Sequence, residues 1–217
     1  MRNEEAIKQY IIGTVNERVE AGYILIDLLF TYNSKNENIE EPLEYFKYYP
    51  SDYGLEPSII YNRIKETKPK VVVDVGVLYG LSTRTCLLAA REVDAHVYSC
   101  DIVAPKRGII DFIHKYNLGK YWSFYLGSDL DLKFIDLFRD NKIDIALLDS
   151  NHEAPHVVAQ LEIYSQVISD NGSMFIHDCN DAGVKYAVDY WASRNPGWER
   201  IVYPTKLIYT EFKRKVK

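Results

Sequence analysis

Along most of the chain, short runs of apolar residues alternate with longer stretches in which apolar residues recur every three or four positions. The short runs are typical of buried parallel strands, and the longer stretches of helices that pack one face against a sheet. Their alternation predicts an α/β fold in which a mostly parallel sheet carries helices on both faces. The predicted strands are Val71–Val75, His96–Asp101, Trp122–Tyr125, Ile143–Asp149 and Ser173–His177. The predicted helices are Glu56–Thr67, Ser82–Arg91, Lys106–Tyr116, Asp131–Arg139, Pro155–Ile168 and Gly183–Arg194.

The end of the chain departs from this alternation. Trp198–Tyr203 and Lys206–Phe212 have the pattern of two strands joined by a tight turn at Pro204 and Thr205. Such a pair predicts an antiparallel hairpin. We therefore expect the hairpin to add an antiparallel edge to an otherwise parallel sheet.

The beginning of the chain also differs from the alternating strand and helix pattern. Residues 4–30 keep a helical spacing of apolar positions, whereas residues 32–57 are polar, acidic and aromatic. We expect residues 1–56 to form an N-terminal helical extension, as a lid or a homodimer contact, and residues 57–217 to form one domain. The aromatic residues of the extension either line a ligand pocket or only cover the sheet. They are Tyr45, Phe46, Tyr48, Tyr49 and Tyr53.

Composition and charge narrow the classes of function. The net charge of −5 argues against a nucleic-acid partner, and three scattered cysteines without a C-x-x-C spacing argue against a disulfide framework or a zinc site. The charged N-terminus argues against a signal peptide, and the longest apolar stretch, Tyr23–Phe30, is too short to span a bilayer. We therefore expect a cytoplasmic protein with no membrane partner.

The most informative stretch is Asp74–Thr83, with the sequence DVGVLYGLST, between the first predicted strand and the following helix. A loop at the carboxyl end of a parallel strand is where α/β proteins bind ligands. Gly76 and Gly80 allow positive φ and close approach of a ligand, and Ser82 and Thr83 can cap the helix. The spacing is not the G-x-G-x-x-G of dinucleotide-binding proteins, and a carboxylate at Asp74 would repel a phosphate. The alternative is a tight turn that binds no ligand.

Polar residues also follow the next two predicted strands. Asp101 ends the second strand, where an acid can accept both hydroxyls of a ribose; otherwise it caps a helix or lies in a solvated turn. Ser128 and Asp129 follow the third strand, where they either bond the edge of an adenine or cap the helix that starts near Asp131.

Two acids and a histidine end the fourth and fifth strands. Asp149 and Asp178 are expected at one edge of the sheet, where two neighbouring carboxylates suggest an Mg²⁺ site. Alternatively, one carboxylate is hydrogen-bonded and the other caps a helix. His152 can accept a proton from a hydroxyl, or it is a surface residue of a loop. The same reasoning gives His177 a structural or supporting role, and His156 a packing role on the next helix.

Together these segments resemble the class I S-adenosylmethionine (SAM)-dependent methyltransferases, and in particular methyltransferase family 24, with relatives among cephalosporin hydroxylase-like and catechol O-methyltransferase-like enzymes. The resemblance covers roughly residues 57–212 and rests on Asp74–Thr83, on Asp149-Ser150-Asn151-His152 and on His177-Asp178. It implies a Rossmann-like methyltransferase sheet with SAM as the cofactor. It also implies transfer of a methyl group to a hydroxyl of a small molecule, of sugar or natural-product type.

The resemblance implies that the Asp74–Gly80 loop wraps the methionine part of SAM, that Asp101 holds its ribose and that Asp149 lies near the methyl centre. The expected cofactor-binding residues are Asp74, Gly76, Val77, Tyr79, Gly80, Ser82, Asp101, Ile102, Ser128, Asp129 and Asp149. Two alternatives remain, a methyltransferase-fold protein that only binds a partner and an NAD(P)-dependent oxidoreductase.

In catechol O-methyltransferase-like enzymes, an aspartate after the fourth strand and a later Asp-Asn pair bind Mg²⁺, and a lysine three residues after the first acid is the base. By position, Asp149 and Asp178 match two metal ligands, and His152 matches the base. Cys179 stands where the asparagine is expected, and a thiol is a poor ligand for Mg²⁺. Either Asn180 or Asp181 would have to take its place.

Overall fold

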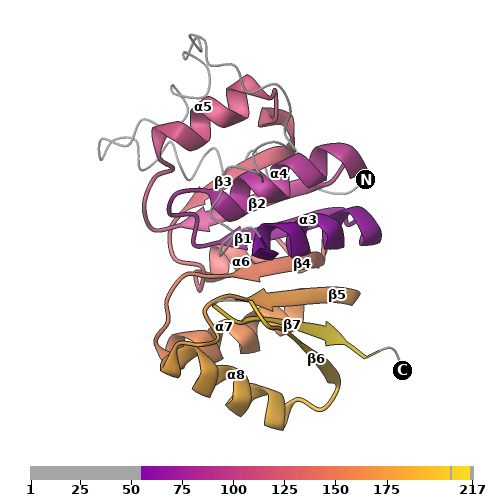
Figure 1. Ribbon diagram of the computed structural model, residues 1–217, viewed down its shortest axis with the longest axis vertical. Coiled ribbons are helices and arrows are strands. Elements are labelled where there is room, and N and C mark those ends of the chain that lie inside the picture. Colours follow the sequence, from indigo (N-terminus) through magenta and orange to yellow (C-terminus); the bar gives the residue numbers. More distant parts are fainter. Residues whose placement is uncertain (1–54, 206, 216–217) are drawn as a thin grey trace.

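The computed structural model describes residues 55–205 and 207–215, which form a seven-stranded sheet between two layers of helices (Figure 1). The strand order is β3-β2-β1-β4-β5-β7-β6. The pairs from β3 to β5 are parallel, whereas β5 with β7 and β6 with β7 are antiparallel. The predicted fold class is therefore confirmed. The strands are β1 Val71–Val75, β2 His96–Asp101, β3 Trp122–Leu126, β4 Ile143–Leu148, β5 Ile168–Ile176, β6 Trp198–Tyr203 and β7 Tyr209–Arg214.

The helices divide between the two faces of the sheet. The division follows from β1, whose residues point alternately to opposite faces: Val71, Val73 and Val75 join one hydrophobic cluster and Val72 joins the other. The first cluster contains buried residues of α6, α7 and α8, and the second those of α3, α4 and α5. The helices are α3 Leu55–Thr67, α4 Leu81–Val93, α5 Arg107–Lys115, α6 Leu132–Asp136, α7 Ala154–Val167 and α8 Ala182–Arg194, with a 3₁₀ turn η2 at Gly119–Tyr121.

Three predicted elements differ from the structure by three or more residues at one end, and other boundaries differ by one or two residues. β5 begins at Ile168, not at Ser173, because Ile168 pairs with Ile143 and a shift in register accommodates the polar residues that follow. The connection between β6 and β7 is longer than a tight turn. Backbone hydrogen bonds from Thr205 to Tyr203 and from Ile208 to Thr205 fold it, and β7 starts only at Tyr209. Helix α6 has five residues, fewer than the Asp131–Arg139 span expected.

Most of the expected N-terminal extension, residues 1–54, lies outside the described residues, and so does the set of aromatic residues assigned to a ligand pocket. Within the described ranges, none of the helices combines the length and apolar character needed to cross a bilayer.

Candidate active site

The loop between β1 and α4, residues 76–80, is called the glycine loop below. Gly76 and Gly80 have φ values of +86° and +78°, which favour glycine. A Cβ on Gly76 would lie 1.8 Å from the carbonyl oxygen of Asp149, and one on Gly80 would lie 2.4 Å from Ile109. Leu78, at the tip of the loop, also has a positive φ of 45°. The loop is therefore held against neighbouring chain segments in a conformation that most residues avoid.

Asp74 lies beneath the glycine loop rather than on its surface. Its side chain is buried, and its Oδ2 accepts hydrogen bonds from Thr83 at 2.5 Å and from Ser99 at 3.4 Å. Burial raises the pKa of Asp74 to about 6, and hydrogen bonds from Thr83 and Ser82 partly oppose this rise. Thr83 thus fastens α4 to the sheet and does not cap the helix, whose N-cap is Gly80 without a side-chain hydrogen bond.

Asp101 connects the ends of β1 and β2. Its Oδ2 accepts hydrogen bonds from the backbone amides of Val77 and Leu78, at 2.8 and 3.0 Å, and its Oδ1 accepts one from Val103. The carboxylate therefore holds the glycine loop and is not the N-cap of α5, which is Lys106. Exposed apolar side chains surround this contact: Leu78, Tyr79, Ile102 and Val103.

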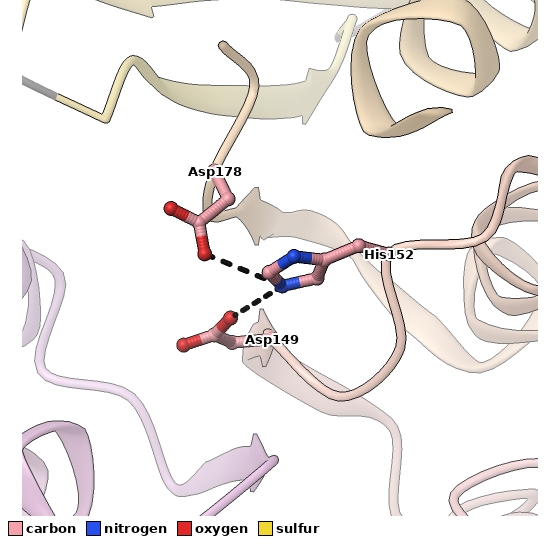
Figure 2. A group of neighbouring side chains, drawn as sticks. All are labelled: Asp149, His152 and Asp178. Carbon is pink, nitrogen blue, oxygen red and sulfur yellow. Dashed lines mark hydrogen bonds and ion pairs between the residues drawn. The ribbon is translucent and has the colours of Figure 1, made fainter. Parts of the chain in front are cut away.

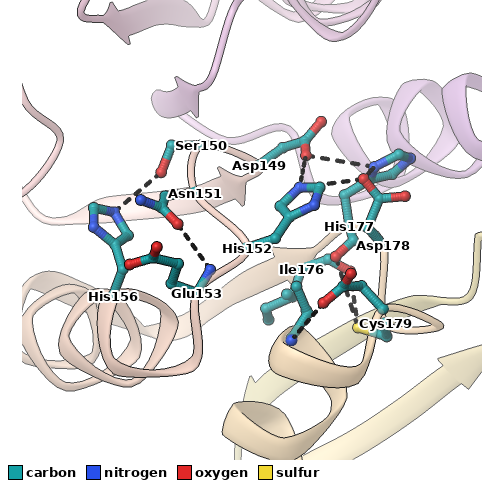
Figure 3. A network of polar contacts seen from close by, with 12 residues as sticks. Asp149, Ser150, Asn151, His152, Glu153, His156, Ile176, His177, Asp178 and Cys179 are labelled. Atoms are coloured by element: carbon teal, nitrogen blue, oxygen red, sulfur yellow. Dashed lines mark hydrogen bonds and ion pairs between the residues drawn. The ribbon is translucent and has the colours of Figure 1, made fainter.

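Two carboxylates and two imidazoles meet where β4 and β5 end, and we call Asp149, His152, His177 and Asp178 the Asp–His cluster. Nε2 of His152 lies 3.5 Å from Oδ1 of Asp149 and 3.3 Å from Oδ2 of Asp178 (Figure 2). Nδ1 of His177 faces the same two oxygens, at 3.5 and 3.0 Å (Figure 3). The structure thus brings together Asp149, His152 and Asp178, as the sequence predicts, and adds His177.

Charge pairing sets the protonation of the Asp–His cluster. Burial works against ionisation of Asp149, but hydrogen bonds from His152 and His177 keep the pKa of its carboxyl below the ordinary value. The hydrogen bond to Asp149, with the nearby charge of Asp178, raises the pKa of His152 despite partial burial. An imidazole with a raised pKa is a stronger proton acceptor. The cluster can therefore take a proton from a group placed beside it.

A cavity of about 720 Å³ joins the glycine loop to the Asp–His cluster. Asp149 and His177 belong to its lining, and Ser82 and Arg84 of α4 contribute further polar groups. The remaining lining side chains that the structure describes are mostly apolar or aromatic. They include Pro57, Ile60, Val77, Tyr79, Leu147 and Tyr209. Such a lining suits a small organic molecule held beside a few polar groups.

Comparison with known proteins shows which family the central part of the chain resembles. The model of a methyltransferase domain family, methyltransferase family 24, matches residues 73–179. This segment runs from β1 to the end of β5 and contains both the glycine loop and the Asp–His cluster. Over this segment the chain resembles a methyltransferase domain of this family. In a comparison with curated proteins, no significant match is found.

Solved structures show that the fold is that of SAM-dependent methyltransferases. A methyltransferase of Podospora anserina, PaMTH1 with SAH bound, is 15% identical over 93% of this chain and 96% of its own, with a TM-score of 0.61. A putative caffeoyl-CoA O-methyltransferase from Staphylococcus aureus is 18% identical over 92% and 99%, with a TM-score of 0.58. TomG, an O-methyltransferase of Streptomyces achromogenes in complex with SAM, is 11% identical over 88% and 96%, with a TM-score of 0.59.

Asp129 has contacts that neither sequence-based interpretation foresaw. Its buried Oδ2 accepts hydrogen bonds from Gln160 at 2.6 Å and from Ser150 at 3.0 Å, and it lies 3.1 Å from Nε2 of His156. The N-cap of α6 is Asp131, whereas Ser128 accepts a hydrogen bond from the amide of Leu130. Asp129 therefore ties α7 to the loop after β4, and the amphipathic pattern of α7 carries no sign of this contact.

Two of the positions that could supply a third Mg²⁺ ligand, Cys179 and Asp181, make other contacts. The thiol of Cys179 is buried and donates to the carbonyl of Ile176. Asp181 is occupied as the N-cap of α8, accepting from the amides of Gly183 and Val184. Asp149 and Asp178 thus remain the two carboxylates that Mg²⁺ could use, an ion that is usually bound through one or two carboxylates together with waters.

Proposed function

We propose that the protein transfers the methyl group of SAM to a hydroxyl of a small molecule, and that residues 57–217 form the catalytic domain. The observation that carries this proposal is the position of the Asp–His cluster. Asp149 and His177 of this cluster line the same cavity as the glycine loop, and Nε2 of His152 lies 3.5 Å from Oδ1 of Asp149, so a proton acceptor lies next to the space that the loop lines. O-methylation needs both groups, because the acceptor hydroxyl loses its proton as the methyl group arrives.

SAM, when bound, supplies an electrophilic methyl group on a sulfonium. The backbone of the glycine loop is assigned to its methionine part, because Gly76 and Gly80 line the cavity while they pack against Asp149 and Ile109. Ser82 lies beside the loop in the cavity lining and offers a hydroxyl to that part. We assign Asp101 and the exposed Ile102 to the ribose and adenine side. Asp74 is assigned to support of the loop from beneath.

His152 is assigned as the general base. Its ring is about half exposed, at 42% of the side chain, so the proton it accepts can pass to solvent. Asp149 and Asp178 hold Nε2 from two sides, which orients the ring and stabilises the imidazolium that forms. The mostly apolar cavity favours an acceptor with a flat or apolar body that leaves its hydroxyl near the polar groups.

Replacement of His152 tests this assignment. We expect His152→Ala to lower methyl transfer from isotope-labelled SAM to a panel of phenols and sugars by about 100-fold or more, because a positioned base contributes that much. Affinity for S-adenosylhomocysteine (SAH), measured by calorimetry, should stay within about threefold of the wild-type value, since His152 lies outside the glycine loop.

His114→Ala is the matched control because it removes an imidazole from the last turn of α5. It should leave both turnover and affinity unchanged. Wild-type turnover in His152→Ala would remove His152 from the mechanism.

A further inference from the structure

We propose that Asp129 is a positioning residue for the reaction: through Ser150 it holds residues 149–153, called the base loop below, and so places His152 against Asp149. The inference rests on the proposed function, because it concerns the base assigned there. Asp129 follows β3, whereas the base loop follows β4, so the two segments lie far apart in the sequence. The contact between them is made by side chains.

Asp129 is itself fixed to α7. The residue is 6% exposed, and its Oδ2 accepts a hydrogen bond from Gln160 at 2.6 Å and lies 3.1 Å from Nε2 of His156. The hydroxyl of Tyr164 donates to its backbone carbonyl at 3.0 Å. His156, Gln160 and Tyr164 follow one another at intervals of four residues, which places them on one face of the helix. Three successive turns of α7 therefore hold both the carboxylate and the backbone of Asp129.

Ser150 connects this anchor to the base loop. Its Oγ donates to Oδ2 of Asp129 at 3.0 Å and accepts a hydrogen bond from Gln160 at 3.1 Å. The same oxygen lies 3.3 Å from Nε2 of His156 (Figure 3). A hydroxyl offers one donor and two acceptor positions, so these three contacts together restrict its rotation.

The position of Ser150 determines that of its neighbour Asp149. The amide of Asp149 donates to the carbonyl of Val75 at 3.1 Å, which fixes the start of the base loop to β1. Oδ1 of Asp149 lies 3.5 Å from Nε2 of His152. A displacement of Ser150 would therefore change the contact between the carboxylate and the imidazole.

The energetics of such a network favour a role in geometry over a role in stability. Removal of a carboxylate from water costs free energy that its hydrogen bonds largely offset, so the net gain in stability is small. A fully satisfied polar network instead specifies one arrangement of its members. Catalysis depends on such an arrangement, because a misplacement of about 1 Å can lower a rate by about 100-fold.

Two variants of nearly the same shape test the positioning role. Ser150→Thr keeps the hydroxyl and Ser150→Val replaces it with a methyl group, at a residue that is exposed. We expect Ser150→Val to lower kcat, measured with isotope-labelled SAM and the panel of phenols and sugars, by about tenfold or more. Ser150→Thr should stay within about threefold of wild type. KM for SAM and affinity for SAH should change by less than about threefold in both variants.

A matched control removes a serine hydroxyl elsewhere on α7. Ser165 donates to the carbonyl of Glu162 and makes this contact near the end of the helix. Ser165→Ala should therefore leave kcat unchanged. A purely structural role of Ser150 would change the unfolding free energy without separating kcat of the Thr and Val variants.

Hydrogen exchange measures the base loop without using activity. The amide of Asp149 is bonded to Val75, and that of Glu153 donates to Oδ1 of Asn151 at 2.7 Å, so both amides report local opening of the loop. NMR should show both amides exchanging about tenfold or more faster in Ser150→Val than in Ser150→Thr. Amides of the glycine loop should exchange equally in the two variants.

The outcomes separate this proposal from the proposed function. Equal exchange in the base loop of the two variants, equal measurable turnover, or loss of SAH affinity in Ser150→Val would each overturn the positioning role. Failure of wild-type protein to bind SAM and SAH would instead overturn the proposed function. The exchange rates decide whether Asp129 and Ser150 hold the base loop even when no member of the panel is methylated.

Discussion

At the scale of single residues, Gly76 shows how one position serves both packing and binding. The carbonyl of Asp149 occupies the place where a Cβ on Gly76 would lie. The glycine therefore sets the distance between the cofactor loop and the Asp–His cluster. A side chain at this position would separate the two groups that the proposed reaction has to bring together.

Gly76→Ala should consequently be strongly disruptive. A Cβ 1.8 Å from a backbone oxygen and a φ of +86° are expected to cost about 3 kcal/mol or more of unfolding free energy. SAH binding should weaken as well. Urea denaturation and calorimetry would measure both effects. Gly197→Ala is the control, because nothing lies within 4 Å of its added Cβ, and its stability should change by less than about 1 kcal/mol. Equal stability of the two variants would contradict the packing role.

Asp74 should make stability depend on pH. Its folded pKa of about 6 exceeds its ordinary value of 3.8, so folding favours the protonated form. The stability that the protonated carboxyl provides is fully present below about pH 4 and is lost as pH rises through about 6, by roughly 3 kcal/mol in all.

Asp74→Asn lacks this titration. Urea denaturation at pH 4 and at pH 7 measures this effect. The unfolding free energy of Asp74→Asn relative to that of the wild type should rise by up to about 3 kcal/mol between the two pH values. Asp136→Asn, which changes an exposed carboxyl of α6, is the matched control. A difference between wild type and Asp74→Asn that stays constant with pH would show that Asp74 is not perturbed.

Single residues also differ in whether their contacts could be predicted from the sequence. The types and strand-end positions of Asp149, His152 and Asp178 were enough to predict that they meet, because parallel strands end at one edge of the sheet. The contacts of Asp74 and Asp129 were not predictable, since a carboxylate in a sequence does not reveal which neighbour it faces. For the same reason His177 was given only a supporting role.

At the scale of elements, α3 is fastened to the C-terminal hairpin by a buried ion pair. Glu211 of β7 is fully buried and accepts hydrogen bonds from Arg63 of α3 at 2.5 Å, from Tyr203 at 2.7 Å and from Ser173 at 2.7 Å. Helix α3 also contributes Pro57 and Ile60 to the cavity. The ion pair therefore fixes one wall of the cavity to the sheet.

Loss of the Arg63–Glu211 ion pair should destabilise the folded protein. Glu211→Ala is expected to lower the unfolding free energy by about 3–5 kcal/mol, because it leaves the partly buried guanidinium of Arg63 without its carboxylate. Asp136→Ala breaks an exposed ion pair with Arg139 and should cost less than about 1 kcal/mol. Denaturant titration of both variants provides the measurement. Similar losses in the two would show that burial does not strengthen the Arg63–Glu211 pair.

Element boundaries were predictable wherever the apolar pattern was strong. β1, β2 and β6 have the bounds expected from sequence, because each is a continuous or alternating run between clear breaks. The start of β5 was missed because Asp170, Asn171 and Gly172 have the composition of a loop. Its pairing with β4 across a shift in register is a tertiary effect that no local pattern contains.

At the scale of the whole molecule, the order of the strands determines that the glycine loop and the Asp–His cluster are neighbours. β1, β4 and β5 are neighbours in the sheet (Figure 1). The glycine loop, Asp149 and His177 follow these strands and therefore lie at one edge of the sheet. Alternating strands and helices predicted the fold class, and the motif after β1 predicted the family. The roles expected for residues 1–54, as a lid or dimer contact, stay predictions because these residues lie outside the described part of the chain.

The central claim is that this chain binds SAM as its cofactor, and calorimetric titration of the full chain tests it most directly. SAM, SAH and NADH are titrated separately, each with and without EDTA. We expect micromolar binding of SAM and SAH, no heat with NADH, and cofactor affinity that does not require metal. Absence of binding by both SAM and SAH to folded protein, or binding of NADH in their place, would contradict it.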